Sequence, residues 1–428
     1  MTTFTSTDPR ASQGGASRNL RVTILGLNYA PEPTGNAPYT ASLAEGLAAL
    51  GHRVHVVTGY PHYPEWQIRS GFRGSSIREE RNGVRVTRLR HFVPANPGSI
   101  GRLHMELSFG LRLLFARWTK PDVVLLVSPA LFSSAFAVMR ARFGFRRPPI
   151  ALWVQDLYSR GLEEAQDSGK TVVGMATRFE SWVLRSAHRV VAIHDRFRKH
   201  MVGPLAVEDD RVTVIKNWTH LPPHRAVDRD AVRVKLGWGP GETVILHAGN
   251  MGAKQGLENV IEAARISSLR GDGLRFTLMG DGNQRSRLEA LGRDIPHLRF
   301  IDPLPDEEFQ SALGAADILL VNEKPEVSEM AVPSKLTSYF STGLPVLAAT
   351  QLGSVTASEI EASGGGIRVD AGNPEALVQA ANKLSADKAA AELLGRNGLR
   401  YRHDTLSKAG ALAQYDGLIR DLAASLKR

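Results

Sequence analysis

The chain has 428 residues, of which 43% are hydrophobic and 22% are charged, and it contains no cysteine. This composition excludes a collagen-like or mainly disordered protein, and the lack of cysteine excludes disulfides, thiolate metal sites and cysteine nucleophiles. Fifty-three Lys and Arg residues against 43 Asp and Glu residues give a net charge of +10. This excess favours a polyanionic partner: nucleic acid, anionic lipid or a phosphorylated substrate.

The N-terminal residues 1–19 are polar and rich in Thr, Ser and Gly, so they predict a disordered tail rather than a signal peptide. The longest uncharged stretch, Val123–Met139, is interrupted by Ser128-Pro129. It is shorter than the roughly 20 residues that a membrane-spanning helix needs. We therefore expect a buried strand, a turn and the start of a helix there, in a cytoplasmic protein.

Short apolar runs rich in β-branched residues alternate with helical patterns along the chain. Many of these runs are almost continuously apolar, which is typical of strands covered on both faces in a parallel sheet. The first predicted set is Val22–Leu27, Arg53–Gly59, Val84–Leu89, Asp122–Ser128, Ile150–Asp156, Arg189–His194 and Arg211–Lys216. The second set is Thr243–Ala248, Arg275–Gly280, Leu298–Ile301, Asp317–Val321, Pro345–Ala349 and Gly366–Val369.

These two sets predict an α/β protein with two doubly wound, Rossmann-like domains in tandem. Pro222-Pro223 and mixed charges mark the boundary region, Asn217–Asp230. The predicted parts are a tail (1–19), an N-terminal domain (20–217), a C-terminal domain (218–405) and a final helix (406–428). The final helix carries one apolar stripe that could pack back toward the N-terminal domain. The stripe consists of Leu412, Tyr415, Ile419, Leu422 and Leu426.

Two loops that follow predicted strands are candidates for binding phosphate. In the first, Gly35 and Asn36 precede a helix, whose free N–H groups suit an anion, although a plain β-α turn explains the glycine equally well. In the second, Gly249, Asn250 and Lys254 lie in the segment GNMGAKQGL. Glycines around one lysine suit a diphosphate, and this interpretation is favoured over a solvated surface lysine.

Two further strand ends belong to the same group of candidates. Gly280, Asp281 and Gly282 follow a predicted strand, where Asp281 either caps the next helix or belongs to the site. Ser334 and Lys335 fall in the first turn of a predicted helix, where a lysine opposes the helix dipole unless an anion lies nearby. Glu329, just upstream, could accept hydrogen bonds from sugar hydroxyls.

Asp156 ends an apolar strand, and ligands of open α/β sheets bind beyond the carboxyl ends of the strands. Asp156 is therefore either a site residue or a helix N-cap. The pair His194-Asp195 also lies at the end of a predicted strand, and a structural role is favoured for it. The histidines show no metal-ligand spacing, so no metal is expected.

Arginines are concentrated in residues 69–112. They are Arg69, Arg73, Arg78, Arg81, Arg85, Arg88, Arg90, Arg102 and Arg112, against Glu79, Glu80 and Glu106. A second cluster comprises Arg140, Arg142, Arg146 and Arg147. A surface that meets anionic lipid headgroups or a lipid diphosphate is preferred over a merely solvated face.

Taken together, seven motifs resemble retaining glycosyltransferases of family 4, in the branch that builds colanic-acid-type exopolysaccharide. They run in order over about residues 20–350. The motifs are Asn28–Asn36, Gly51–Thr58, Tyr60–Trp66, Val154–Asp156, Asn217-Trp218, Gly249–Leu257 and Pro333–Thr337. The resemblance implies a GT-B fold, with two Rossmann-like domains facing each other across a cleft, a nucleotide-sugar donor held mainly by the C-terminal domain, and no metal requirement.

The resemblance also implies roles for individual residues. Gly35 would lie beside the donor diphosphate, which Lys254 would neutralise, and Asn250 stands where many members have Arg. Glu329 corresponds to the first glutamate of the family's paired-glutamate signature, and Ser338 to the second, which usually holds the ribose. Ser334 and Lys335 would contact phosphate in compensation. Asp156 stands near a position where many members have His, as a sugar-binding or acid/base group.

The sequence thus predicts a cytoplasmic, peripheral membrane hexosyltransferase that moves a sugar from a nucleotide-sugar to a lipid-linked or oligosaccharide acceptor. One alternative keeps the fold but is a sugar-nucleotide 2-epimerase, which needs no acceptor. The other is a non-catalytic protein that binds anionic membranes or nucleic acid, although no nucleic-acid-binding signature is present.

Overall fold

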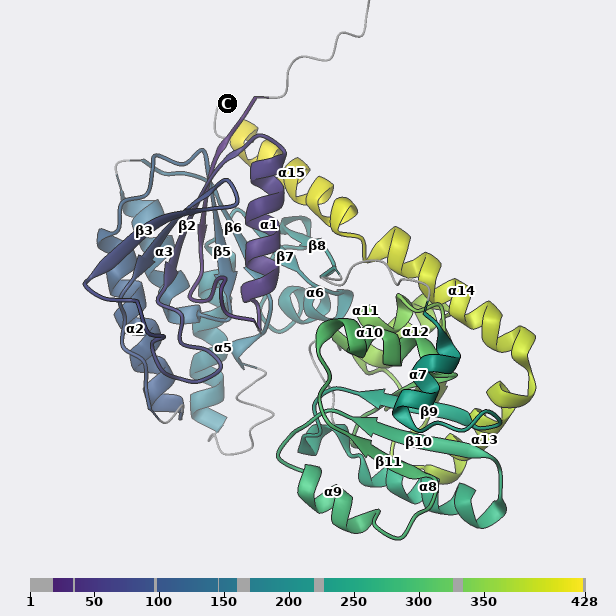
Figure 1. Ribbon diagram of the computed structural model, residues 1–428. Helices are drawn as coiled ribbons and strands as arrows, with labels where there is room; N and C mark the ends of the chain where they lie inside the picture. The colour runs from purple at the N-terminus through teal and green to yellow at the C-terminus, as the bar shows by residue number, and fades with distance from the viewer. Residues whose placement is uncertain are drawn as a thin grey trace, which may run out of the picture. The chain divides into compact units, whose positions relative to one another are not determined.

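The computed structural model describes residues 18–33, 35–95, 98–144, 146–159, 170–218, 227–325 and 334–425 (Figure 1). The predicted site residue Glu329 lies outside these ranges, and only the backbone of Ser334 is described. Within these ranges, no helix is long and apolar enough to cross a membrane.

The strands alternate with helices along the chain, as the sequence pattern predicts. The strands are β1 (Arg21–Leu25), β2 (Arg53–Gly59), β3 (Ser76–Arg81), β4 (Val84–Leu89), β5 (Val123–Ser128), β6 (Ile150–Val154), β7 (Arg189–Ala192), β8 (Val212–Val214), β9 (Thr243–Ala248), β10 (Leu274–Met279), β11 (Leu298–Ile301), β12 (Ile318–Asn322), β13 (Val346–Ala349) and β14 (Gly366–Val369). The helices are α1 (Ala37–Ala49), α2 (Ser99–Phe115), α3 (Leu131–Phe143), α5 (Lys170–Arg185), α6 (Asp195–Val202), α7 (Arg229–Leu236), α8 (Glu258–Arg270), α9 (Arg285–Leu291), α10 (Asp306–Ala315), α11 (Ser334–Phe340), α12 (Val355–Ser363), α13 (Pro374–Ala386), α14 (Lys388–Thr405) and α15 (Lys408–Ser425). Two short 3-10 helices are η1 (Asp209–Arg211) and η2 (Ala253–Gln255).

The first sheet has eight strands in the order β3-β4-β2-β1-β5-β6-β7-β8. β1 pairs in parallel with β2 and β5, but β3 pairs antiparallel with β4. This antiparallel edge strand was not predicted. The sequence of β3, SIREER, is mostly charged and has no apolar run, so hydrophobic patterning does not reveal it. Charged side chains are typical of an exposed edge strand, because they discourage pairing with other chains.

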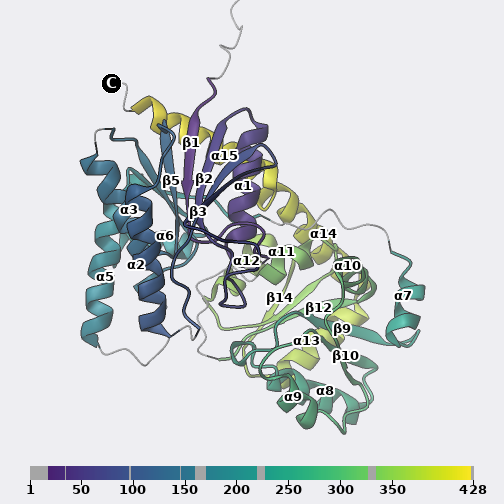
Figure 2. The same ribbon diagram turned by 60° about the vertical axis from the view of Figure 1, so that its left-hand side comes forward.

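The second sheet has six strands in the order β11-β10-β9-β12-β13-β14, and its pairs are parallel. This is the Rossmann order, in which the direction of winding reverses between the first and fourth strands, here β9 and β12. One core cluster packs α8 and α13 on one face, and another packs α7, α10 and α11 on the opposite face (Figure 2). The ends of β9 and β12 therefore mark the expected ligand position.

The chain divides into two compact units, residues 1–152 with 416–428 and residues 153–415. In the first unit, the last part of α15 is fixed by Asp416, whose carboxylate lies 2.7 Å from His52 Nε2. Tyr415, Ile419 and Leu422 of the predicted apolar stripe are buried, while Leu426 lies outside the described residues. The predicted boundaries at residues 217/218 and 405/406 stay predictions.

Candidate functional site

Two glycine-containing loops meet at the carboxyl ends of β9 and β10. The backbone N–H of Gly249 donates to Met279 O at 2.8 Å, and that of Met251 donates to Asp281 O at the same distance. The N–H of Gln284 returns to Met251 O at 3.0 Å. The structure therefore brings together two loops that are separate in sequence.

The contact between the loops requires glycine. Gly249 and Gly280 have φ angles of 129° and 136°, a region that L side chains rarely adopt. A Cβ added at Gly280 would lie 2.0 Å from Gly249 O, and one added at Gly282 would lie 2.6 Å from the backbone of Met251. Larger residues would push the loops apart, so the glycines allow their backbones to form one continuous surface.

Asp281 is not a cap for the helix that follows. Its Oδ1 accepts from Gly282 N at 2.8 Å, whereas α9 begins at Arg285 with Gln284 in the N-cap position. Of the two sequence interpretations, helix capping is therefore wrong. The Asp281 carboxylate instead lies within the joined loops.

Lys335 approaches the same loops from the first turn of α11. Its Nζ lies 3.0 Å from Nε2 of His247, the residue before the end of β9, and its Cε lies 2.9 Å from the position of a Cβ added at Gly249. His247 is fully buried, and burial together with the Lys335 charge lowers its pKa well below the usual range. The imidazole is therefore neutral and accepts a hydrogen bond from the Lys335 ammonium group.

A second lysine, Lys254, is exposed on η2 in the same segment. Its backbone is fixed, because Lys254 O accepts from Lys324 N at 2.9 Å. The buried amide of Asn322, at the end of β12, donates to the carbonyl oxygens of Gln255 and Gly256 at 2.8 and 2.9 Å. Asn322 thus connects the Lys254 segment to the sheet, a role that the sequence does not reveal.

Glu323 is a buried carboxylate that sequence reasoning missed. It follows β12 directly and accepts hydrogen bonds from the hydroxyl groups of Thr350 and Thr356. Burial raises its pKa, while these hydroxyls and the charge of Lys335 oppose the shift. The Lys335 ammonium group therefore donates to the neutral imidazole of His247 and also lies close enough to the Glu323 carboxyl group to lower its pKa. Ser338 lies nearly one helical turn after Lys335 on α11.

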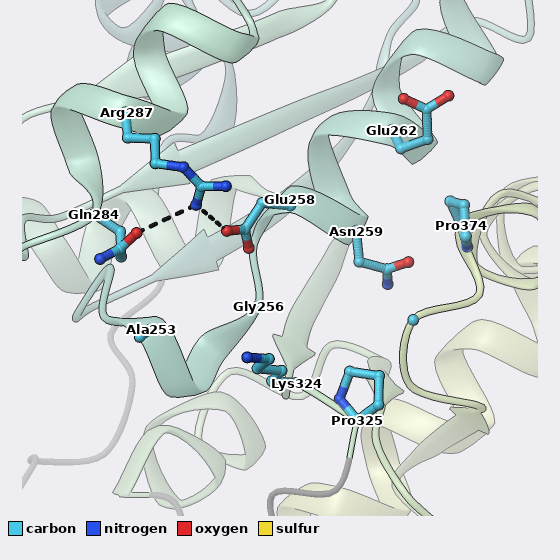
Figure 3. Close-up of a pocket in the computed structure, with 11 residues that line it drawn as sticks. Ala253, Gly256, Glu258, Asn259, Glu262, Gln284, Arg287, Lys324, Pro325 and Pro374 are labelled. Atoms are coloured by element: carbon cyan, nitrogen blue, oxygen red, sulfur yellow. Dashed lines mark hydrogen bonds and ion pairs between the residues drawn. The ribbon is translucent and has the colours of Figure 1, made fainter.

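A cavity of about 620 Å³ lies next to η2 (Figure 3). It is lined by Ala253 and Gly256, which flank Lys254, and by the first turns of α8 and α13. Arg287 pairs there with Glu258 and donates to Gln284 Oε1 at 3.3 Å. The lining carries carboxylates as well as cations, so its charge does not favour a diphosphate. We therefore place the candidate diphosphate site at the joined loops rather than in this cavity.

In the first unit, Gly35 and Asn36 lie where β1 and β5 adjoin. Gly35 has a φ of 67°, and Asn36 Nδ2 donates to Ser128 O, at the end of β5, at 3.3 Å. Buried Glu32 fixes the preceding loop, since it accepts from the backbone N–H groups of His62 and Tyr63 at 2.9 Å each. Both predicted residues thus sit at the switch point of their sheet, and Glu32 was not predicted.

Comparisons with known proteins agree with this geometry. Residues 34–218 match the glycosyl transferase 4-like domain, and residues 228–401 match the glycosyl transferases group 1 family. WcaI of Escherichia coli K12, named a colanic acid biosynthesis glycosyl transferase, is 32% identical over 339 residues, which are 76% of this chain and 82% of WcaI. The chain belongs to glycosyltransferase family 4.

Solved structures share the fold of this glycosyltransferase. Sucrose-phosphate synthase from Thermosynechococcus elongatus superposes with a TM-score of 0.70 at 17% identity, covering 95% of this chain and all of the other. HepE from Anabaena, solved in complex with UDP, gives 0.68 at 13% identity, covering 93% of this chain and all of HepE. The fold is GT-B, as the sequence motifs predicted.

Asp156 of the glycosyltransferase is exposed just beyond β6. Its Oδ1 accepts from Leu157 N at 2.8 Å, and the buried carboxylate of Glu180 accepts from Tyr158 N and Ser159 N at 2.7 and 3.0 Å. None of these contacts involves the two glycine loops. Its catalytic role therefore stays a prediction.

Other predicted features have structural roles. His194 is the N-cap of α6 and accepts from Phe197 N at 3.2 Å, so the structural interpretation of this histidine is confirmed. Within the described part of the glycosyltransferase, no three His, Asp or Glu side chains are grouped closely enough to hold a metal ion.

The arginine-rich segment is not one uniform surface. Arg88 is only 1% exposed and pairs with Glu79 at 2.7 Å, so its inclusion among the surface arginines is wrong. Glu106, counted against these arginines, is also buried. Arg140 donates to Leu113 O and Ala116 O at 2.6 Å each, which satisfies carbonyl groups at the end of α2.

Proposed function

We propose that this family 4 glycosyltransferase is a retaining enzyme that transfers a hexosyl group from a nucleotide-sugar to a lipid-linked acceptor in the biosynthesis of an exopolysaccharide. One observation carries the proposal. Joined glycine loops, Lys254 on one of them, and Lys335 held by buried His247 meet at the switch point of the six-stranded sheet. Backbone donors and two cations in such a place suit a nucleoside diphosphate.

The names of related proteins support the biological assignment. WcaI is named for colanic acid biosynthesis, and HepE was solved with UDP and with UDP-glucose. A nucleotide-sugar donor and an exopolysaccharide product are therefore the natural proposals for this chain.

The proposed chemistry follows from where charge develops. As the bond between the anomeric carbon and the diphosphate breaks, negative charge grows on the departing oxygen. Lys254 and Lys335 stabilise this charge more strongly in the transition state than in the ground state, which lowers the barrier. The acceptor hydroxyl attacks the same face of the sugar, and its proton passes to the departing phosphate. This route needs no enzyme nucleophile and no metal.

The membrane assignment rests on charge alone. Arg73, Arg78 and Arg81 are exposed in the first unit, and basic residues near an anionic lipid surface attract it. We propose that the enzyme acts as a peripheral protein on the cytoplasmic face of the plasma membrane, where a lipid-linked acceptor is accessible. Nucleic acid is not a proposed partner.

Product analysis tests the function directly. The enzyme is incubated with UDP-, GDP-, dTDP- or ADP-hexoses, with and without a lipid-linked glycan acceptor, and the products are examined by NMR. The proposal expects transfer that depends on the acceptor and that preserves the anomeric configuration. Inverted product contradicts the retaining mechanism, and a new isomer of the donor sugar formed without acceptor supports the 2-epimerase instead.

A further inference from the structure

A second hollow lies in the first unit. It has a volume of about 890 Å³ and is formed by β2, β3, β4 and the end of α2; β2, β3 and α2 are labelled in Figure 2. We call it the basic groove. Its lining residues are His55, Ser76, Arg78, Arg85, Thr87, Leu89, Arg112, Phe115, Ala116, Arg117, Trp118, Thr119 and Lys120.

The lining of the basic groove is strongly positive. Its cationic residues are Arg78, Arg85, Arg112, Arg117 and Lys120, and no lining residue is acidic. Within the described ranges, none of these five forms an ion pair with a carboxylate. Glu80 lies opposite Arg85 across the antiparallel strand pair, so the two side chains share a face of the sheet and Glu80 offsets part of this charge. Glu79 pairs with Arg88 instead. The groove therefore keeps a net surplus of positive charge.

The floor of the groove is uncharged and fixed. His55 is 4% exposed, and its ring nitrogens lie 2.9 Å from Thr87 Oγ1 and 3.2 Å from Thr119 Oγ1. Burial, followed by the charges of Arg85 and Arg78, lowers the pKa of His55 to about 4. The imidazole is therefore neutral at physiological pH, and the two groove arginines add to the effect of burial.

The turn that carries the remaining cations is held in place. The Arg140 guanidinium lies 4.2 Å from the centre of the Trp118 ring. Lys120 has a φ of 52°, which is uncommon for a residue other than glycine, and its N–H donates to Trp118 O at 2.7 Å. A non-glycine residue kept in this conformation often marks a functional position. The turn thus presents Arg117 and Lys120 at the groove on a defined backbone.

Arg112 also lines a neighbouring hollow of about 930 Å³, beside the carboxyl end of β4. This hollow contains Trp66, His91 and Phe92, so it offers aromatic surface on which sugar rings can pack. Arg112 lines both hollows, so aromatic residues lie on one side of it and cations on the other. A ligand that joins a glycan to a compact anion matches both ends.

We propose that the basic groove binds a diphosphate group, and that the acceptor of the proposed transfer supplies it. This inference rests on the proposed function, because it identifies the acceptor as a glycan joined to lipid through diphosphate. Arginine suits such a group, since its planar guanidinium donates two parallel hydrogen bonds to phosphate oxygens. A groove with cations on several sides binds one compact anion more selectively than a flat charged surface does.

The test uses the full chain, with inorganic pyrophosphate as the first probe. Arg78→Ser/Arg85→Ser removes two groove cations that are exposed and carry no ion pair, so folding is expected to be unaffected. Arg293→Ser/Arg400→Ser, which removes the same charge from exposed positions in the second unit, is the matched control. With the loops after β9 and β10 occupied by a saturating nucleoside diphosphate, calorimetry should show saturable pyrophosphate binding. This binding should be at least tenfold weaker in the groove variant and within twofold of wild type in the control.

A second arm identifies the source of the anion. Wild-type protein should bind phosphatidylcholine vesicles that contain polyprenyl diphosphate more strongly than vesicles of phosphatidylcholine alone, and the groove variant should lose this difference. Absence of saturable pyrophosphate binding, or equal losses in both variants, overturns the site. Pyrophosphate binding without any preference for the lipid diphosphate overturns the assignment to the acceptor.

Titration of each variant with nucleoside diphosphates separates this proposal from the proposed function. The groove variant should retain wild-type affinity at the loops after β9 and β10. If nucleotide binding is intact while neither the pyrophosphate titration nor the vesicle assay gives the expected result, the transferase proposal is retained and the groove proposal is rejected.

Discussion

Nζ of Lys335 lies 3.0 Å from Nε2 of buried His247, so a neutral imidazole positions the ammonium group beside Gly249. Because His247 is fully buried, it cannot reach a substrate itself. It acts on the reaction only through Lys335. The effect of replacing His247 on activity should therefore depend on whether Lys335 is present. Replacing a residue that merely stabilises the fold should have the same effect with or without Lys335.

We expect His247→Leu to lower kcat/KM by about 10-fold to 100-fold, because a hydrogen bond to a charged group contributes about 1.5–3 kcal/mol. His247→Gln should recover part of the activity, since its amide oxygen can accept from the lysine. In a Lys335→Ala background, His247→Leu should have little further effect. Independent, additive losses measured by steady-state kinetics would contradict the positioning role.

The second prediction concerns Lys254, on η2 beside the joined loops. Lys254→Ala should reduce activity by about ten- to a hundred-fold or more, because the lysine stabilises the charge of the diphosphate, and it should leave thermal unfolding unchanged, because the side chain is exposed. Lys383→Ala, an exposed lysine on α13, is the matched control. Turnover near the wild-type rate at limiting donor would remove Lys254 from the mechanism.

Activity should survive EDTA. The expectation rests on the family resemblance and on the two lysines, which are placed to neutralise the leaving group. The rate is measured after extensive chelation, and again after Mg²⁺ or Mn²⁺ is added back. Complete loss that either ion restores would show that a metal ion, rather than the two lysines, neutralises the leaving group.

Stability should depend on pH through Glu106, a buried residue of α2. Burial raises its pKa to about 7 against 4.5 in the unfolded chain, although its carboxylate accepts from Phe132 N at 2.9 Å and Arg102 lowers the pKa slightly. The folded state therefore binds the proton more tightly, so stability falls as pH rises from about 4.5 to about 7. Two to three pKa units correspond to about 3–4 kcal/mol at most.

Glu106→Gln should remove this dependence. The variant should be more stable than wild type at pH 8 and close to it at pH 4.5, as measured by denaturant unfolding. Glu80→Gln, which changes an exposed carboxylate of β3 in the same unit, serves as the control and should leave the pH profile unchanged. A Glu106→Gln profile parallel to wild type would show that Glu106 titrates normally.

The enzyme should bind anionic vesicles through residues 69–112 and 140–147. Sedimentation with phosphatidylglycerol should weaken as salt rises and fall when Arg69, Arg73, Arg78 and Arg81 are changed to Ser, because each basic residue contributes about 1 kcal/mol at best. A variant with the same charge loss in the second unit, at positions 293, 299, 396 and 400, should bind like wild type. Binding that ignores lipid charge would contradict the membrane assignment.

Hydrophobic patterning was sufficient for most of the sheet strands. β2, β4, β9, β11 and β14 have the predicted bounds, because each is a short segment in which apolar and β-branched residues recur. β3 was missed since its charged sequence is set by its place at the edge of the sheet. A strand of this kind is recognised only when its partner β4 is known.

The candidate site was predicted in part. Glycines and lysines near strand ends can be found from local sequence, and the loops of Gly249 and Gly280 do meet. Glu323 and His247 could not be found in this way. The importance of Glu323 depends on Thr350, 27 residues away, and that of His247 on Lys335, 88 residues away. Such contacts are created by the fold and leave no local spacing.

Calorimetric titration with UDP, GDP, dTDP and ADP tests the central claim, that the joined glycine loops bind a donor diphosphate. Wild-type protein should bind at least one of these nucleotides, and Lys254→Ala should bind it at least tenfold more weakly than Lys383→Ala does. The account is contradicted if none of the four binds, or if Lys254→Ala and Lys383→Ala bind with the same affinity.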